Sequence, residues 1–241
     1  MNSDFSLRDI TLTYSPNCEP RCGVSAPEWV VLHYTGMPDC DSALARLRNP
    51  AARVSAHYLI STNGAIFGLV SERARAWHAG VSCWRGEHDV NSRSIGIELM
   101  HVGHQPGHDC PPFPERQMAA LERLLSAILQ RWHIEPVGVL AHSDVAPGRK
   151  IDPGEHFDWR RLARRGLAVN WPIEKSAEDE HDVEQEAFLA KARVFGYGEW
   201  DFRAILDAFR RRFRPHALNR RTSATSADIH VLKTIAPPKN P

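Results

Sequence analysis

The sequence predicts an α/β fold, with a mixed central sheet flanked by helices and a small C-terminal domain of three helices. Short apolar runs of strand length recur through the first two thirds of the chain. One long stretch between two of these runs carries leucine and isoleucine at helical spacing. After about residue 180 only helical patterns remain. Strands interleaved with helices are typical of α/β domains, and the helical tail forms a separate unit.

Three of the apolar runs predict strands. Residues 29–33 and 137–142 each end in a histidine, His33 and His142. Residues 94–99 alternate aliphatic with small or polar side chains, as expected for a strand with one face on a core. Because ligands bind at the carboxyl ends of strands in open α/β sheets, the two histidines mark the edge where we expect a site.

A hairpin is predicted earlier in the chain. The apolar runs 55–60 and 65–70 flank the pair Asn63 and Gly64. Both residue types tolerate positive φ, so an Asn-Gly pair between apolar runs favours a tight turn between antiparallel strands.

Helices are predicted between and after the strands. Leucine and isoleucine recur at helical spacing through residues 121–132, with charged residues opposite. A shorter helix is expected over 41–47, where Asp41 can cap its start. Another is expected over 159–165, ending at the following glycine.

We divide the chain into a domain at residues 1–166, a linker at 167–180 and a helical domain at 181–241. The linker is short of aliphatic residues and ends in an acidic run. A unit of about sixty residues is near the lower limit for independent folding, so we expect the helical domain to pack against the first domain. The three helical patterns of the C-terminal domain cover residues 188–195, 202–213 and 229–235.

Composition excludes several classes of protein. The 241 residues include 30 Lys and Arg against 29 Asp and Glu, so the formal net charge is +1. Such a balance does not predict binding to nucleic acid, and it suits a small neutral or zwitterionic substrate. No apolar stretch approaches the length of a membrane span, so we expect no membrane insertion. The N-terminal residues lack the pattern of a signal peptide, and five cysteines without a regular framework indicate reduced thiols. We therefore expect a cytoplasmic protein, with export by another route as the alternative. For Cys18 and Cys22 the alternative is a disulfide bridge.

A catalytic metal site is one interpretation of the strand ends. The loop after His142 is rich in proline and glycine and carries Lys150 and Asp152. If it turns back, two imidazoles and one carboxylate meet, and three N/O ligands plus water are typical of catalytic zinc. Glu98, on the polar face of its strand, can then act as general base. The alternatives are structural histidines and a salt-bridged strand carboxylate.

A second group of potential ligands follows the 94–99 strand. His101, His104, His108 and Cys110 lie close together, but glycine and proline interrupt them. This composition favours an exposed loop over a metal site.

Five segments between about residues 29 and 166 carry a resemblance to a known family. They are VVLHYTG, RVSAHYLISTNG, RAWHAGVSCWRG, NSRSIGIEL and AHSDVAPGRKIDPG. In this order they resemble the zinc N-acetylmuramoyl-L-alanine amidases of the AmpD/AmiD type, which are related to peptidoglycan recognition proteins and phage amidases. The resemblance implies one Zn²⁺ per chain, bound by His33, His142 and Asp152. It also implies Glu98 as the catalytic base and Lys150 as the residue that stabilises the oxyanion.

The resemblance also implies a substrate. Enzymes of this family hydrolyse the amide between the N-acetylmuramic acid lactyl group and L-alanine in muropeptides, which predicts a role in cell-wall recycling. Arg53 and Trp77 match positions that contact the muropeptide, with a surface ion pair and a core aromatic as the alternatives. Asn91 either contacts substrate or shapes its loop. His57 and His78 lie inside matched segments, and we expect them to be hydrogen-bonded structural histidines, with support of the metal ligands from behind as the alternative.

Two departures and two rival functions accompany the resemblance. Asp89 and Val90 stand where the anhydro-specific branch has a basic residue, so the form of sugar stays open. The segment FGYGEWDFRAILDAFRRRFRP resembles the peptidoglycan-binding-like helical domain of the AmiD branch, and we interpret its Arg210–Arg212 run as a solvated face. The rivals are a non-catalytic peptidoglycan-binding module and, from the same arginines, a nucleic-acid-binding protein.

Overall fold

A six-stranded mixed sheet forms the centre of the molecule. The computed structural model describes residues 9–104, 110–170 and 180–235. The strand order is β1-β5-β4-β7-β3-β8, and every neighbouring pair is parallel except β4 and β5. Its strands are β1 (Ile10–Leu12), β3 (Trp29–Tyr34), β4 (Tyr58–Ile60), β5 (Ile66–Gly68), β7 (Ser94–Leu99) and β8 (Val139–Ala141). A separate antiparallel pair joins β2 (Cys18–Pro20) to β6 (Ala74–Ala76). The predicted fold class is confirmed.

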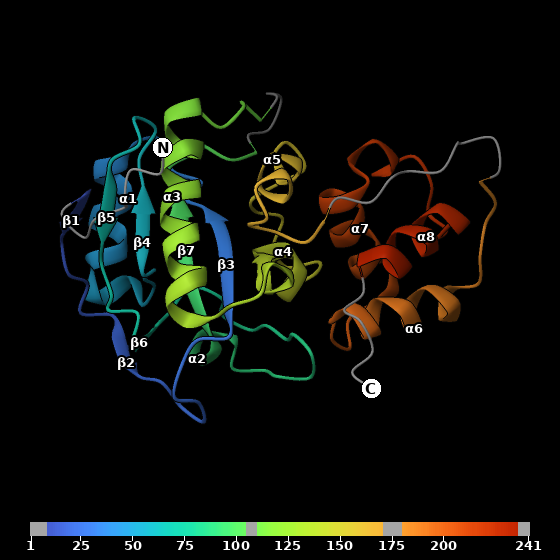
Figure 1. The fold of residues 1–241 in the computed structure, drawn as a ribbon, viewed down its shortest axis with the longest axis horizontal. Coiled ribbons are helices and arrows are strands. Elements are labelled where there is room, and N and C mark those ends of the chain that lie inside the picture. The colour runs from blue at the N-terminus through green and yellow to red at the C-terminus, as the bar shows by residue number, and fades with distance from the viewer. Residues whose placement is uncertain (1–8, 105–109, 171–179, 236–241) are drawn as a thin grey trace.

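Helices cover the sheet and form the C-terminal part (Figure 1). They are α1 (Cys40–Arg48), α2 (Val90–Arg93), α3 (Glu115–Trp132), α4 (His142–Val145), α5 (Trp159–Arg164), α6 (Gln185–Phe195), α7 (Phe202–Phe213) and α8 (Ser226–Ile235). The start of α1 differs from the prediction, because Asp39 and not Asp41 accepts the hydrogen bond from the Ser42 backbone N–H. No helix within the described ranges is long and apolar enough to cross a membrane.

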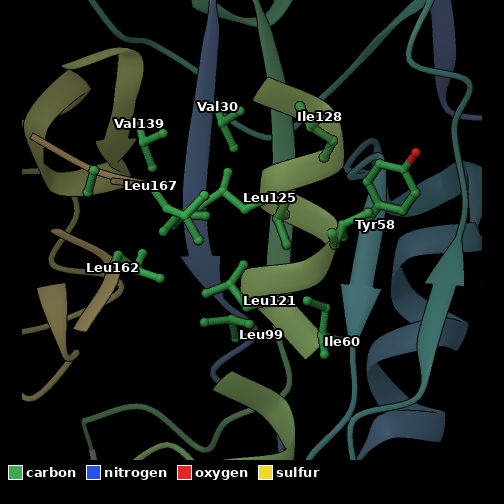
Figure 2. Packing of buried hydrophobic residues seen from close by; sticks show 14 of the residues in the cluster. Val30, Tyr58, Ile60, Leu99, Leu121, Leu125, Ile128, Val139, Leu162 and Leu167 are labelled. Carbon is green, nitrogen blue, oxygen red and sulfur yellow. The ribbon is translucent and has the colours of Figure 1, made fainter. Parts of the chain in front are cut away.

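The first core lies between the sheet and α3. Figure 2 shows Leu121, Leu125 and Ile128 of α3 directed at side chains of the strands, among them Val30 and Ile60. The apolar residues at helical spacing in α3 therefore form one continuous buried face. The predicted hairpin is also present, since β4 and β5 pair antiparallel around the Asn-Gly turn.

The first core extends further along the chain than the predicted boundary. Leu167 and Ala168, which we assigned to the linker, are 8% and 2% exposed and pack in this core. Figure 2 shows Leu167 there. Two apolar residues do not make a long hydrophobic pattern, so the sequence did not distinguish them from a linker. Residues 171–179 of the predicted linker lie outside the described residues.

The second core joins the opposite face of the sheet to the C-terminal helices. Trp29 and Val31 of β3 and Leu140 of β8 point to this face, because side chains alternate along a strand. Phe188, Phe209 and other apolar residues of α6, α7 and α8 belong to the same cluster. The C-terminal helices therefore pack directly on the first domain, beyond α4 in Figure 1.

The expectation that Arg210–Arg212 forms a solvated face is wrong. Arg210 and Arg212 are 0% and 2% exposed. Arg210 pairs with Asp228, with 2.6 Å between Nη2 and Oδ2. Arg212 reaches across to the first domain, where it pairs with Asp144. These arginines fix the helices to each other and to the sheet, so they are not available for a nucleic-acid phosphate.

Candidate active site

Three neighbouring strands bring polar side chains to one edge of the sheet. His33 on β3 is the register partner of Glu98 on β7. On the other side of β3, Leu32 pairs with Ala141, so His142 comes directly after the paired end of β8. Strand β8 ends at Ala141 and not at His142 as predicted, because Asp144 accepts the Ala141 backbone N–H and starts α4. The side chains of His33, Glu98 and His142 thus start from one sheet edge.

The loop after α4 turns back toward His142. The backbone N–H of Lys150 donates to the Ala146 carbonyl at 3.0 Å, which closes the first turn. The Ser143 N–H donates to the Asp152 carbonyl, also at 3.0 Å. These two bonds place Asp152 beside His142, as the sequence interpretation required.

The three predicted ligands form a compact cluster. His33 Nδ1 lies 2.9 Å from His142 Nδ1 and 3.2 Å from Asp152 Oδ2, and His142 Nδ1 lies 2.9 Å from the same oxygen. Ligand atoms around a tetrahedral zinc, at 2.0–2.1 Å from the metal, lie about 3.3 Å from one another. Within the described ranges this is the group of His, Cys, Asp and Glu residues with metal-binding geometry.

The hydrogen bond behind His142 shows why the cluster fits a cation. His142 Nε2 donates to the Ala79 carbonyl at 3.1 Å, and a carbonyl can only accept. In the neutral ring, Nδ1 therefore presents a lone pair to the carboxylate oxygen of Asp152. Such buried acceptors repel each other unless a positive charge lies between them. The donor set of two imidazoles and one carboxylate thus fits a divalent metal.

Burial and mutual charge shift the acidity of the cluster. Burial, assisted by His142, lowers the pKa of His33 to about 4. Burial alone would raise the pKa of Asp152, but its two histidine neighbours outweigh this and hold the pKa well below its ordinary value. Burial and then the charge of Asp152 raise the pKa of Glu98 to about 8, against the opposing charge of Lys150. Groups with such perturbed pKa values are concentrated at functional sites.

Glu98 and Lys150 line a cleft of about 520 Å³ together with the three clustered residues. Glu98 Oε2 is buried and has no hydrogen-bond partner among the described residues. An unpaired buried carboxylate oxygen is costly, and a group from substrate or solvent can satisfy it. The alternative interpretation of Glu98 as a salt-bridged strand carboxylate finds no support within the described ranges, where no ion pair of Glu98 occurs.

The predicted substrate-binding residues lie at three different places. Trp77 is half-buried and lines the cleft. Arg53 is exposed, with its guanidinium carbon 6.0 Å from the centre of the Trp77 ring, so it lies near the rim. Asn91 is buried, and its Oδ1 accepts the backbone N–H groups of His78 and Ala79 at 3.0 and 2.8 Å. The structure thus favours the loop-shaping interpretation of Asn91.

Other residues around the site carried weaker signals in the sequence. His57 and His78 are both buried and hydrogen-bonded, as expected, and His78 contacts His33. His101 is also buried, with its ring bonded to the Pro111 carbonyl, so the expectation of an exposed loop is wrong at that residue. His108 lies outside the described residues. Arg149, which lines the cleft and binds the Ala79 carbonyl, had no distinguishing sequence signal.

Two solved structures resemble the whole fold. The complex of AmiD from Escherichia coli with anhydro-N-acetylmuramic acid-L-Ala-D-gamma-Glu-L-Lys has 33% sequence identity and a TM-score of 0.77, covering 92% of this chain and 91% of that chain. AmpDh3 from Pseudomonas aeruginosa has 30% identity and a TM-score of 0.76, covering 93% and 98%.

Sequence comparison agrees with the structural one. A family described as N-acetylmuramoyl-L-alanine amidase matches residues 23–155. N-acetylmuramoyl-L-alanine amidase AmiD of Escherichia coli is 36% identical over 223 residues, covering 83% of this chain and 79% of AmiD. 1,6-anhydro-N-acetylmuramyl-L-alanine amidase AmpD of Haemophilus influenzae is 43% identical over 110 residues, covering 45% of this chain and 56% of AmpD. This chain therefore belongs to the N-acetylmuramoyl-L-alanine amidase family and is an enzyme of that kind.

Proposed function

We propose that this amidase is zinc-dependent and releases the peptide from muropeptides during cell-wall recycling. It would hydrolyse the amide between the N-acetylmuramic acid lactyl group and L-alanine, with one zinc ion bound by His33, His142 and Asp152. The observation that carries this proposal is the convergence of three ligand atoms within 3.2 Å of one another at the floor of a cleft. The related AmiD and AmpDh3 structures contain anhydromuramyl peptides, which supports a muropeptide as the substrate.

Glu98 and Lys150 divide the remaining chemistry. Zinc bound at the cluster would acidify water and polarise the scissile carbonyl. In its ionised form Glu98 accepts the proton of the attacking water, and its unpaired Oε2 faces no competing donor among the described residues. It then returns this proton to the departing amine of L-alanine. The Lys150 ammonium stabilises the negative charge that develops on the carbonyl oxygen.

Arg53 and Trp77 would hold the rest of the substrate. Trp77 offers an apolar wall inside the cleft, and Arg53 above it can pair with a carboxylate of the stem peptide. Because Arg53 is exposed at the rim, we expect its loss to affect KM more than kcat.

The test is product analysis by mass spectrometry with anhydro- and reduced-end muropeptides as substrates. We expect free stem peptide from the purified enzyme, loss of product after treatment with a chelator, and recovery when one equivalent of zinc is returned. Cleavage that persists in the metal-free protein would refute zinc dependence. Binding of the same muropeptides without cleavage at any metal content would favour the non-catalytic recognition module.

A further inference from the structure

The two histidines of the cluster are both supported from behind by one short segment. His78 Nδ1 lies 3.0 Å from His33 Nε2. The next residue, Ala79, accepts the N–H of His142 Nε2 on its carbonyl at 3.1 Å. Two consecutive residues, His78 and Ala79, thus contact the Nε2 atoms of His33 and His142, although these two histidines lie 109 positions apart in the chain.

The direction of the bond behind His33 follows from its neighbours. The Ser94 hydroxyl donates its single proton to the Val90 carbonyl at 2.6 Å. Ser94 Oγ can therefore only accept from His78 Nε2, which lies 3.3 Å away. With its proton on Nε2, the neutral His78 ring accepts the His33 N–H on Nδ1. His33 is thereby left with a lone pair on Nδ1, the atom that faces His142 and Asp152.

Asn91 fixes the position of this segment. Its single Oδ1 accepts the backbone N–H groups of both His78 and Ala79. These bonds fix the backbone that carries the His78 imidazole and the Ala79 carbonyl. Arg149 contacts the same Ala79 carbonyl and limits its rotation. The His78 ring also lies against Gly96, where a Cβ atom would collide with the ring. The absence of a side chain at Gly96 therefore leaves the space that the His78 ring occupies.

We propose that Asn91 and His78 are positioning residues, which orient both imidazoles and fix their tautomers so that two lone pairs converge on one metal. This inference rests on the proposed zinc function. It replaces the expectation that Asn91 contacts substrate. Residues that orient metal ligands in this way typically change metal affinity by roughly 10- to 100-fold when they are lost.

The Asn91 test compares two variants of similar size. Asn91→Asp keeps an oxygen that can accept both N–H groups, whereas Asn91→Leu removes the acceptor and preserves the volume. We expect the zinc dissociation constant, measured by competition with a chromophoric chelator, to rise roughly 10- to 100-fold in Asn91→Leu. In Asn91→Asp it should stay close to the wild-type value.

The His78 test uses the same logic. His78→Asn can place an oxygen near the present Nδ1, whereas the side chain in His78→Leu cannot accept a hydrogen bond. We expect His78→Asn to preserve zinc affinity and His78→Leu to weaken it. The absorption bands of Co²⁺-substituted His78→Leu should also shift, because the His33 ring turns. His57→Leu is the matched control, because His57 is also buried but bonds to Arg21, Ala74 and Gly96 and to none of the three ligands. It should lower Tm without changing the zinc dissociation constant.

The outcomes separate this inference from the function on which it rests. If wild-type protein binds no zinc, the proposed function fails. If wild type binds zinc but Asn91→Leu keeps its affinity and its Co²⁺ spectrum while KM rises, Asn91 is a substrate contact and the positioning role is refuted. Should Asn91→Leu not fold, Ser94→Ala removes the acceptor of His78 Nε2 together with the hydrogen bond to the Val90 carbonyl. Unchanged zinc affinity and Co²⁺ spectrum in that variant would equally refute the role.

Discussion

The cleft and the interface with the C-terminal helices both bury carboxyl groups, but the hydrogen-bond partners of these groups differ. At the interface, Asp144 accepts from Ala141, Tyr197 and Arg212, so its carboxylate is surrounded by donors. In the cleft, Glu98 Oε2 has no partner among the described residues, and the cluster beside it brings acceptor atoms together.

This difference separates structural from chemical roles. A buried carboxylate with a full set of donors holds two parts of the fold in register, and removing one partner leaves a costly unpaired charge. A buried carboxylate without donors, lining a cleft, leaves an acceptor that a ligand can complete. The two regions meet at α4, which carries His142 and Asp144 two residues apart.

The largest effect is expected from breaking the acceptor cluster. Asp152→Ala removes the only anionic member of the ligand set, so bound zinc and turnover should be lost together. Metal analysis and product release on the same sample check this. Asp158→Ala, in the same loop but at the N-cap of α5, should keep zinc and lose only about 1 kcal/mol of stability. Full zinc occupancy in Asp152→Ala would remove that residue from the ligand set.

Breaking the paired interface should affect stability instead. Arg212→Met leaves Asp144 buried without its charged partner, which typically costs about 3–5 kcal/mol in the free energy of unfolding. Denaturant unfolding measures this loss. Arg220→Met, at an exposed position, should stay within about 0.5 kcal/mol of wild type. Equal unfolding curves for both variants would show that the interface pair does not hold the C-terminal helices.

A smaller and purely kinetic effect is expected at Lys150. Lys150→Ala should raise the barrier by about 3 kcal/mol, which corresponds to roughly a hundredfold loss of kcat. Zinc content and Tm should remain those of wild type, because Lys150 is not among the clustered ligand atoms. Near-normal turnover in this variant would exclude Lys150 as the residue that stabilises the oxyanion.

The effect that is smallest per step of the measurement, one pH unit, concerns the unpaired Glu98 carboxyl in the metal-free protein. The pKa of Glu98 is raised by burial from 4.5 to about 8 in the folded state. Between these values the folded state holds a proton that the unfolded state has released. Its contribution is therefore full below pH 4.5 and is lost as pH rises through 8.

Comparison with Glu98→Gln isolates this contribution, because the histidines titrate in both proteins. The difference in free energy of unfolding, wild type minus variant, should fall with pH by up to about 1.4 kcal/mol per unit across this window. Denaturant titrations in the presence of chelator provide the measurement. A pH-independent difference would show that Glu98 is not held in its protonated form.

The parts of the fold that the sequence predicted are those with a local signal. The Asn-Gly hairpin and the long helix α3 each follow from a pattern within one segment. His33 and His142 attracted attention because both follow apolar runs of strand length. The alternation in β7 also predicted correctly that Glu98 lies on the face opposite Ile97, which packs in the first core.

The parts that it missed depend on contacts between distant segments. Arg212 and Asp144 are 68 positions apart, and a run of arginines has the same appearance whether it is solvated or paired. Leu167 is buried only because α3 and the sheet lie beside it (Figure 2). The role of Asn91 in shaping the site likewise depends on its hydrogen bonds to two backbone N–H groups of another loop. No residue pattern specifies these bonds.

The most direct test of the zinc site is anomalous diffraction at the zinc edge from crystals of the active enzyme. We predict one peak, bonded at about 2.0–2.2 Å by Nδ1 of His33, Nδ1 of His142 and a carboxylate oxygen of Asp152. A zinc ion held by other residues, or crystals that turn over muropeptide without any metal peak at this cluster, would contradict the account.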